Sequence, residues 1–397
     1  NPHISYYAKG SSVLQYIVWD GISAWTKETA DTNQYTGYYN SLKVGTDDQP
    51  RIAYRKYVSG GTPEYSVWYA TRTSSGQWNR EPVAGLTVNA LSYLALALDR
   101  FDRPKIAFKD SDINNLMYAA KSGSWGITIV DTGASSNLGN YPSIAVDAND
   151  FPHISYLDLT TKNLKYAYYN GSIWIRNIVD NSGNINFNTS IAMGTDNKPH
   201  IAYCTISGQY VQSLKYTRWT GAAWTASYTV DTGYVGRYVS MDLDRSGTIP
   251  TNFPKIAYVE DYSTFDLKFA ERKNNAPLLA WAGTANYQAD GVNPEAGGIT
   301  TQFTWKVKYS DADEEAPMTG YPRVHILKGG FEILGSPFAM TEESGALYAT
   351  GKIFKYGPAT LPAVGKDYSY YFEGKDQYAA AAAGTPPGNP PTAWCIS

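Results

Sequence analysis

A five-residue pattern that recurs six times constrains the fold more than any other feature of this chain. Proline is followed by a basic residue, isoleucine, serine or alanine, and an aromatic residue. The copies occupy residues 2–6, 50–54, 104–108, 152–156, 199–203 and 254–258, and successive copies lie 47 to 55 residues apart. Self-similarity at such a period indicates one supersecondary unit that is repeated, with each copy buried against the next.

Each copy of this pattern has similar neighbours in the sequence. An alternating run such as 143–147 precedes it, a Leu-x-aromatic segment such as 164–166 follows it, and a Gly-x-x-Trp turn such as 171–174 opens a fourth run. The runs are rich in Tyr, Val, Ile and Thr, so four short strands per repeat are expected. Such a unit is typical of a β-propeller blade. Ile154 and Tyr156 should face one neighbouring sheet, because side chains alternate along a strand.

The sequence therefore predicts an all-β chain whose first domain, residues 1–273, is a six-bladed β-propeller. The first copy lacks the strand before the pattern, and the sixth has no clear fourth strand. Closure would join these incomplete ends or use residues outside this sequence, so seven blades are the alternative if N-terminal residues are missing. The first residue is Asn1 rather than Met, which indicates that a leader has been removed or left out.

The blade pattern over residues 1–273 resembles secreted bacterial β-propeller repeat proteins of the sialidase-like and lectin-like kind. The resemblance implies an architecture and does not extend to an activity. The Ser-x-Asp-x-Gly-x-x-Trp box of many sialidase blades is absent, because the corresponding turns read Asp147-Ala-Asn-Asp150 and Gly194-Thr-Asp-Asn197. This departure argues against the enzymatic branch of these proteins.

A second domain follows a linker at residues 274–277. Residues 278–384 carry the segments 303–309, 310–313 and 367–373, and on these they resemble an immunoglobulin-like module of extracellular bacterial proteins. The resemblance implies a β-sandwich. Residues 385–397 form a proline-rich tail that we expect to lead to further sequence.

Charge and cysteine content exclude some classes of function. The net charge is −3, with 33 basic and 36 acidic residues, which argues against a nucleic-acid partner. No apolar run reaches the roughly 18 residues of a membrane-spanning helix. Cys204 should be a buried thiol, and Cys395 either has no special role or begins a longer motif such as a haem attachment. Few Cys and Met and much Tyr favour an extracellular or cell-surface location.

The second position of the pattern is basic in every copy, which predicts a basic ring around one face of the propeller. The ring consists of His3, Arg51, Lys105, His153, His200 and Lys255. Bases on different blades cannot converge on one metal ion, so the functional interpretation is an anion- or polysaccharide-binding ring. The alternative is that each base caps a turn or packs on a neighbour.

Acidic and aromatic residues are expected at the opposite face, as candidate ligand-binding residues. The acidic candidates are Asp110, Asp158, Asp261, Asp131, Asp180 and Asp231. Tyr141 and Tyr234 are the aromatic candidates, with Tyr35, Tyr38, Tyr39 and Tyr238 in similar loops. Exposed rings can stack on sugars while carboxylates bond the hydroxyl groups. The alternatives are aspartates that cap turns and tyrosines that fill the space between blades.

In the second domain, Asp311, Asp313, Glu315 and Asp376 are candidate Ca²⁺ ligands. Ca²⁺ takes six to eight oxygen ligands, which a tight acidic turn can supply. A solvated acidic turn is the alternative, and no cofactor is certain. No phosphate-binding loop, nucleophile elbow or His-Glu-x-x-His motif occurs.

These features together predict a non-enzymatic extracellular recognition module that binds glycan or protein at a cell surface. One alternative is a structural subunit of a surface layer or extracellular filament, whose partner is another copy of the chain. A second alternative is a sialidase-like glycosidase or a lyase, although no pair of carboxylates stands out from its repeats.

Overall fold

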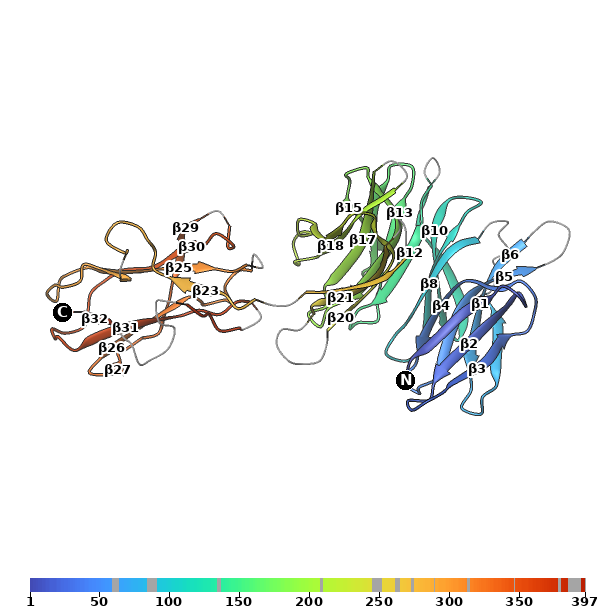
Figure 1. The fold of residues 1–397 in the computed structure, drawn as a ribbon, viewed down its shortest axis with the longest axis horizontal. Coiled ribbons are helices and arrows are strands. Elements are labelled where there is room, and N and C mark those ends of the chain that lie inside the picture. The colour runs from blue at the N-terminus through green and yellow to red at the C-terminus, as the bar shows by residue number, and fades with distance from the viewer. Residues whose placement is uncertain are drawn as a thin grey trace. The chain divides into compact units, whose positions relative to one another are not determined.

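The computed structural model is all-β in the part of the chain that it describes. It describes residues 1–58, 64–83, 91–133, 137–207, 210–244, 252–260, 265–272, 275–288, 290–312, 315–345, 347–377, 380–384 and 394–396. Over these ranges no helix is long and apolar enough to cross a membrane. The chain divides into two compact units: the first is Asn1–Asp244 with Pro254–Glu271, and the second is Arg272–Ser397 with Arg245–Phe253 (Figure 1).

In its described residues the first unit contains six antiparallel sheets in chain order, which we number 1 to 6. Sheet 1 contains β1 (His3–Ala8), β2 (Val13–Trp19) and β3 (Trp25–Asp31), and sheet 2 contains β4 (Thr36–Val44), β5 (Pro50–Val58), β6 (Glu64–Arg72) and β7 (Trp78–Pro82). Sheet 3 contains β8 (Leu91–Leu98), β9 (Pro104–Asp110), β10 (Asn115–Ser122) and β11 (Ser124–Asp131), and sheet 4 contains β12 (Asn140–Val146), β13 (Pro152–Asp158), β14 (Asn163–Tyr169) and β15 (Trp174–Asp180). Sheet 5 contains β16 (Ile185–Met193), β17 (Pro199–Ser207), β18 (Tyr210–Arg218) and β19 (Tyr228–Thr232), and sheet 6 contains β20 (Val235–Leu243), β21 (Pro254–Glu260) and β22 (Leu267–Glu271).

Each sheet is a meander that begins where the predicted blade begins. As expected from the sequence, sheet 1 starts with the strand of the repeated pattern, and sheet 6 ends with its third strand. The first strands of neighbouring sheets pack together, β4 with β8, β8 with β12, β12 with β16, and β16 with β20. This order of sheets confirms the all-β class and the four-stranded repeat, while the closed ring of six blades stays a prediction.

The core of the first unit lies between successive sheets. Between sheets 4 and 5, Leu164 and Tyr166 of β14 pack against Ile201 and Tyr203 of β17, and all four are buried. The strand of the pattern is covered on both faces, so β13 is buried along its whole length. The small residue at its fourth position, Ser155, allows this close approach. Each fully buried aliphatic side chain contributes roughly 1.5–3 kcal/mol to stability.

Cys204 on β17 is buried between sheets 5 and 6, as the sequence predicted. Its thiol Sγ donates to the carbonyl oxygen of Gly236 on β20. The side chain of Cys395 lies outside the described residues.

In the residues described, the second unit contains two antiparallel sheets that share one core. One sheet contains β23 (Leu278–Ala280), β24 (Val292–Asn293), β25 (Phe303–Ser310), β30 (Lys352–Ala359) and β29 (Thr341–Ser344). The other contains β27 (Phe331–Glu332), β28 (Phe338–Ala339), β26 (Arg323–Lys328), β31 (Tyr368–Glu373) and β32 (Trp394–Ile396). Burial alternates along β25 and β31, so Trp305 and Tyr309 of one sheet meet Tyr370 and Phe372 of the other. The immunoglobulin-like assignment stays a prediction, and most of the predicted tail, residues 385–393, lies outside the described residues.

Candidate functional site

The aspartates at the ends of the last strands join neighbouring sheets. Each accepts a hydrogen bond from the tyrosine hydroxyl of the repeated pattern in the following sheet. The pairs are Tyr54–Asp31 at 2.8 Å, Tyr156–Asp131 at 2.6 Å, Tyr203–Asp180 at 2.7 Å and Tyr258–Asp231 at 2.7 Å. Three of these carboxylates, Asp131, Asp180 and Asp231, were candidates for ligand binding, and the structure gives them a role in holding the sheets together.

At the contact between sheets 3 and 4 a lysine completes this arrangement. Lys165 on β14 lies 2.5 Å from Oδ2 of Asp131, the oxygen that also accepts from Tyr156. We call Tyr156, Lys165 and Asp131 the polar triplet. The hydroxyl and ammonium groups compensate the buried carboxylate, which would otherwise be costly to bury. Burial, followed by the charge of Asp131, raises the pKa of Tyr156 well above its usual value.

Sheets 2 and 3 meet through a different set at the same positions. Phe108 stands where the other internal patterns have tyrosine, Val83 follows β7 where the other sheets have aspartate, and Met117 replaces the lysine. We call Phe108, Met117 and Val83 the apolar triplet. Their side chains lie in one buried cluster, with Phe108 fully buried. At this contact the tyrosine hydroxyl and the aspartate carboxylate are therefore both replaced by apolar side chains.

The aspartates that follow the pattern strands cap turns. Oδ1 of Asp158 accepts from the backbone N–H of Thr160 at 2.9 Å, and Oδ1 of Asp110 accepts from the N–H of Asp112 at 3.0 Å. Both carboxylates are buried. The third candidate of this group, Asp261, lies outside the described residues.

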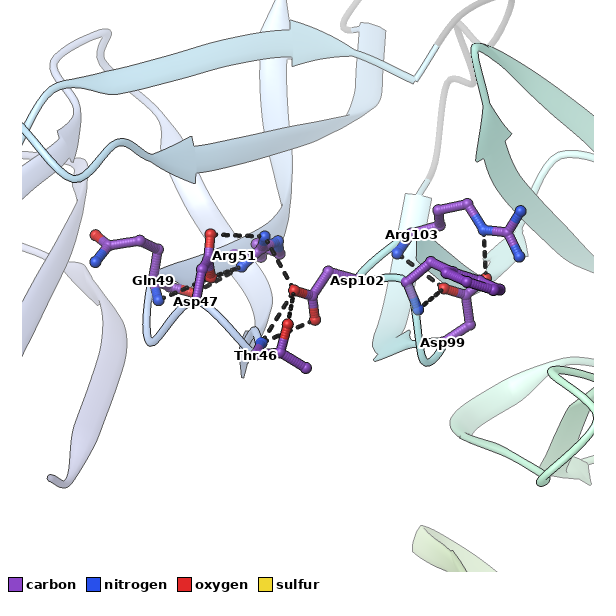
Figure 2. Close-up of polar contacts among 8 residues, drawn as sticks. Thr46, Asp47, Gln49, Arg51, Asp99, Asp102 and Arg103 are labelled. Carbon is purple, nitrogen blue, oxygen red and sulfur yellow. Dashed lines mark hydrogen bonds and ion pairs between the residues drawn. The ribbon is translucent and has the colours of Figure 1, made fainter.

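The predicted ring bases lie beside carboxylates of the loops that join the first and second strands. Arg51 bonds Asp47 at 2.8 Å and lies 3.6 Å from Asp102 of the next sheet, whose carboxylate also accepts from Thr46 (Figure 2). Equivalent pairs are Lys105–Asp99 at 3.4 Å, His153–Asp147 at 3.5 Å and Lys255–Asp244 at 2.9 Å. Carboxylates therefore stand among the bases, whereas the sequence led us to expect bases at one end of the sheets and carboxylates at the other.

The histidines of the ring also bond tyrosines of their own sheets. Nδ1 lies 2.6 Å from Tyr16 Oη for His3, 2.5 Å from Tyr166 Oη for His153, and 2.5 Å from Tyr216 Oη for His200. Burial is the largest influence on His153 and lowers its pKa, against the charge of Asp147. These contacts fix the histidines as parts of the sheets.

A repeated bulge positions tyrosines at the opposite ends of the sheets. The first strands of sheets 2, 3, 4 and 6 change register there, and the tyrosine at the bulge has a positive φ in each. These residues are Tyr39 (φ 47), Tyr93 (φ 56), Tyr141 (φ 48) and Tyr238 (φ 53). A left-handed backbone is uncommon for a bulky residue, and bulges re-aim side chains beside functional sites.

The rings of Tyr39, Tyr93 and Tyr141 lie in a row across sheets 2, 3 and 4. Ring centroids are 5.0 Å apart between Tyr39 and Tyr93 and 4.0 Å apart between Tyr93 and Tyr141. The Tyr93 hydroxyl donates to the Tyr141 hydroxyl at 3.0 Å. Burial, followed by this bond, raises the pKa of Tyr93.

Arg55 on β5 extends the row toward sheet 1. Its guanidinium lies 5.1 Å from the centre of the Tyr38 ring, 4.9 Å from Tyr39 and 4.4 Å from Tyr65. Tyr38 also packs on Tyr7 of β1, with centroids 3.9 Å apart. Tyr38 and Tyr39 are 41% and 40% exposed, so the group faces solvent.

We call this group the tyrosine surface, and it consists of Tyr7, Tyr38, Tyr39, Arg55, Tyr65, Tyr93 and Tyr141. Tyr141, Tyr38 and Tyr39 were predicted from the sequence to lie in candidate loops, whereas Tyr7, Arg55, Tyr65 and Tyr93 were not. A signal was available, because a tyrosine two residues before the small residue of the first strand recurs in Tyr39-Asn-Ser41, Tyr93-Leu-Ala95 and Tyr141-Pro-Ser143. The other aromatic candidate, Tyr234, lies apart from this group in a hollow of about 630 Å³ with Tyr210, Ser213 and Thr232.

A second hollow, of about 400 Å³, lies between sheets 3 and 4. Its lining includes Tyr118, Phe151, Tyr169 and Trp174, with Arg103 beside them. It is at the end of the sheets where the pattern strands begin, and the tyrosine surface is at the end where they finish. The first unit thus has an aromatic surface at each end.

Three candidate Ca²⁺ ligands of the second unit come together. Ligand atoms of Asp311, Glu315 and Asp376 lie within 4.8 Å of one another, and all three residues are buried. Arg272 bonds Glu315 at 2.9 Å, and the backbone N–H of Ala380 bonds Asp376 at 2.8 Å. The fourth candidate, Asp313, lies outside the described residues.

No protein-family model matches the chain, and no curated protein matches it. Among solved structures, a fucose-specific lectin from Aleuria aurantia is 12% identical with a TM-score of 0.45, over 68% of this chain and 90% of the lectin. An ulvan lyase, a polysaccharide lyase, is 12% identical with a TM-score of 0.45, over 77% of this chain and 86% of the lyase. A fungal alcohol oxidase in complex with copper is 10% identical with a TM-score of 0.42, over 99% of this chain and 82% of the oxidase. The low identities and TM-scores leave the ligand of this chain to be argued from its own residues.

Proposed function

We propose that the first unit is a non-catalytic recognition module that binds glycans outside the cell or at a cell surface. The observation that carries the proposal is the tyrosine surface, a row of partly exposed rings around Arg55. The apolar face of a sugar ring stacks on such rings, and tyrosine hydroxyls and a guanidinium bond its hydroxyl or acidic groups. Tyrosine loses little conformational entropy on binding, and the bulge restricts these rings further.

The direction of the carboxyl pKa shifts bears on the choice between binding and catalysis. A glycosidase needs a carboxylic acid with a raised pKa. Five described carboxyl groups of the first unit have a lowered pKa, the opposite of what a glycosidase acid needs, and they are Asp20, Glu28, Asp47, Asp99 and Asp180. For Asp180, burial opposes this direction, and the hydrogen bonds from Tyr203 and Ser182 outweigh it.

A glycan array with the intact chain tests the proposal. We expect hits whose affinity falls at least about tenfold in Arg55→Ala and in Tyr38→Ala, because each change removes a group that would stack on or bond the sugar, and loss of a stacking ring costs roughly 1–3 kcal/mol where nucleic-acid bases stack on aromatic side chains. Tyr228→Ala is the matched control, because Tyr228 is 68% exposed on β19 and outside the tyrosine surface. An array without hits, or equal affinity in all variants, would contradict the proposal. Loss of binding in Tyr169→Ala alone would instead assign the ligand to the hollow between sheets 3 and 4.

The second unit has a separate proposed role as a calcium-binding spacer. Asp311, Glu315 and Asp376 supply oxygen ligands, the kind that Ca²⁺ prefers, and their mutual repulsion would be relieved by a divalent cation. Binding at a Ca²⁺ concentration 100 times Kd would stabilise the folded unit by about 2.7 kcal/mol. We expect Ca²⁺ to raise the melting temperature of the chain and EDTA to reverse the effect. Asp376→Asn should abolish the response, while Asp367→Asn, whose side chain is 52% exposed, should retain it. An unchanged melting temperature would argue against this role.

A structural subunit of a surface layer or extracellular filament is the alternative function. It requires that copies of the chain bind one another, and the uncovered apolar side chains of sheets 1 and 6 favour it. Sedimentation at rising protein concentration separates this alternative from a monomeric glycan-binding module.

A further inference from the structure

The contacts between internal sheets define which side chains one sheet presents to the next. Leu164 and Tyr166 on the third strand of sheet 4 face Ile201 and Tyr203 on the pattern strand of sheet 5. Their exposed fractions are 0%, 5%, 0% and 0%. Each contact therefore has two halves, a Leu-x-aromatic half on the earlier sheet and an Ile-x-Tyr half on the later one.

Sheets 1 and 2 repeat this contact with the same residue types. Leu14 and Tyr16 of sheet 1 pack against Ile52 and Tyr54 of sheet 2, and all four are buried. The two halves are thus complementary at both sites although the sheets differ in sequence.

Sheet 6 presents a Leu-x-aromatic half that is exposed among the residues that the structure describes. Leu267 and Phe269 pair with Val259 and Ala257, the register that Leu214 and Tyr216 have in sheet 5. Leu214 and Tyr216 are 0% and 5% exposed, whereas Leu267 is 78% exposed. Phe269 is 62% exposed.

Sheet 1 presents an uncovered Ile-x-Tyr half. Ile4 and Tyr6 occupy the pattern positions of Ile52 and Tyr54, which are fully buried. Ile4 is 45% exposed, and Tyr6 is half-buried. Figure 1 shows the blue strands of sheet 1 and the yellow strands of sheet 6 apart from each other, so the two halves do not cover one another within this chain.

We propose that these two surfaces bind each other between copies, with sheet 6 of one molecule packed on sheet 1 of the next. The contact continues the series of sheet-to-sheet contacts from one molecule into another. Because the two surfaces differ, the interface is heterologous and produces open rows or closed rings of copies. The proposal is independent of what the tyrosine surface binds.

A pair of complementary variants tests this interface in the intact chain. Ile4→Glu blocks the surface of sheet 1, and Phe269→Glu blocks the surface of sheet 6. Both residues are exposed in the isolated chain, so neither change should impair folding. Ile173→Glu is the matched control, because Ile173 is 62% exposed, like Phe269, and lies on neither surface.

We expect the mass of the wild-type chain and of Ile173→Glu to rise with concentration in analytical ultracentrifugation. Each blocked variant alone should remain monomeric, with self-association weakened at least about tenfold. A mixture of the two should form a dimer and nothing larger, because the intact sheet 6 of one binds the intact sheet 1 of the other.

If the wild-type chain stays monomeric while its concentration is raised 100-fold, the proposal is overturned. Blocked variants that still associate alone, or a mixture that forms no dimer, would also overturn it. Glycan binding by the monomeric Phe269→Glu variant tests the proposed function separately from self-association, because that variant keeps the tyrosine surface intact.

Discussion

The contact between sheets 2 and 3 and the contact between sheets 3 and 4 share a backbone arrangement but differ in chemistry. The first is built on the apolar triplet of Phe108, Met117 and Val83, and the second on the polar triplet of Tyr156, Lys165 and Asp131. Both are buried, and neither mixes members of the two sets. The difference teaches that the hydroxyl and the carboxylate occur together or are both replaced by apolar groups, because either one alone would leave a buried polar group uncompensated.

The largest expected effect comes from placing a carboxylate in the apolar set. Val83 is 1% exposed and lies in one cluster with Phe108, so Val83→Asp buries a charge beside a ring without a hydroxyl. We expect a loss of about 3–5 kcal/mol in the free energy of unfolding by urea, or insoluble protein. The triple variant Val83→Asp, Phe108→Tyr, Met117→Lys should recover most of the stability or the soluble yield. A stable single variant would contradict the comparison.

A smaller effect is expected from removing one hydroxyl from the polar set. Tyr156→Phe leaves Oδ2 of Asp131 without the 2.6 Å bond from the phenol, and the loss should be about 1–3 kcal/mol. Tyr228→Phe, at an exposed position, should change the urea midpoint very little. Conversion of the whole polar triplet to Phe, Met and Val should cost less than Tyr156→Phe alone. If the triple change costs more, compensation within the set is not the cause.

The pH dependence of stability distinguishes sheet 4 from sheet 3 at the second pattern position. Sheet 4 has His153 there, whose pKa burial lowers from 6.5, and sheet 3 has Lys105. Below pH 6.5 the unfolded chain binds a proton that folded His153 still excludes, so stability falls by up to about 1.4 kcal/mol per pH unit until the folded pKa is reached. Urea unfolding at pH 7.5 and 5.5 should show a smaller fall in His153→Gln than in the wild type. Equal falls would assign the pH dependence to other groups.

The smallest expected effect concerns the exposed loops that join sheets 2 and 3 outside the core. Asp102 bonds the N–H and hydroxyl of Thr46 at 3.0 and 2.7 Å and lies near Arg51. Asp102→Ala should reduce stability by about 1 kcal/mol, the net contribution of a typical hydrogen bond, because Arg51 keeps its bond to Asp47. A larger loss in urea unfolding would show that these loops, rather than the buried triplets, determine how the sheets adhere.

The strands and the core of the first unit could be predicted from the sequence because they depend on local patterns. Ile154 and Tyr156 are buried as the alternation along the pattern predicted. The partners of the polar groups could not be predicted in the same way. Asp131 and Tyr156 are 25 residues apart and belong to different repeats, so a search within one repeat finds an aspartate at a turn and misses the hydroxyl that it accepts from.

A comparison across repeats contains part of the missing information. The repeat that has phenylalanine at position 108 is also the one preceded by valine at position 83, and this joint change indicates contact. The tyrosine surface was only partly predictable, because its rings depend on a bulge that changes the register between Asn140 and Ser143 and at its counterparts. In the second unit, Asp311 and Asp376 come together from distant segments, since both follow strands that face one core.

The buried thiol of Cys204 between sheets 5 and 6 can report how often sheet 6 separates from sheet 5. Cys204 is fully buried and its Sγ donates to the Gly236 carbonyl oxygen. A thiol-reactive dye can therefore modify it only while sheet 6 is separated from sheet 5. In a Cys395→Ser background, the labelling rate would count these opening events directly. Molecules whose sheet 6 is bound to sheet 1 of another copy should then be labelled more slowly than monomers.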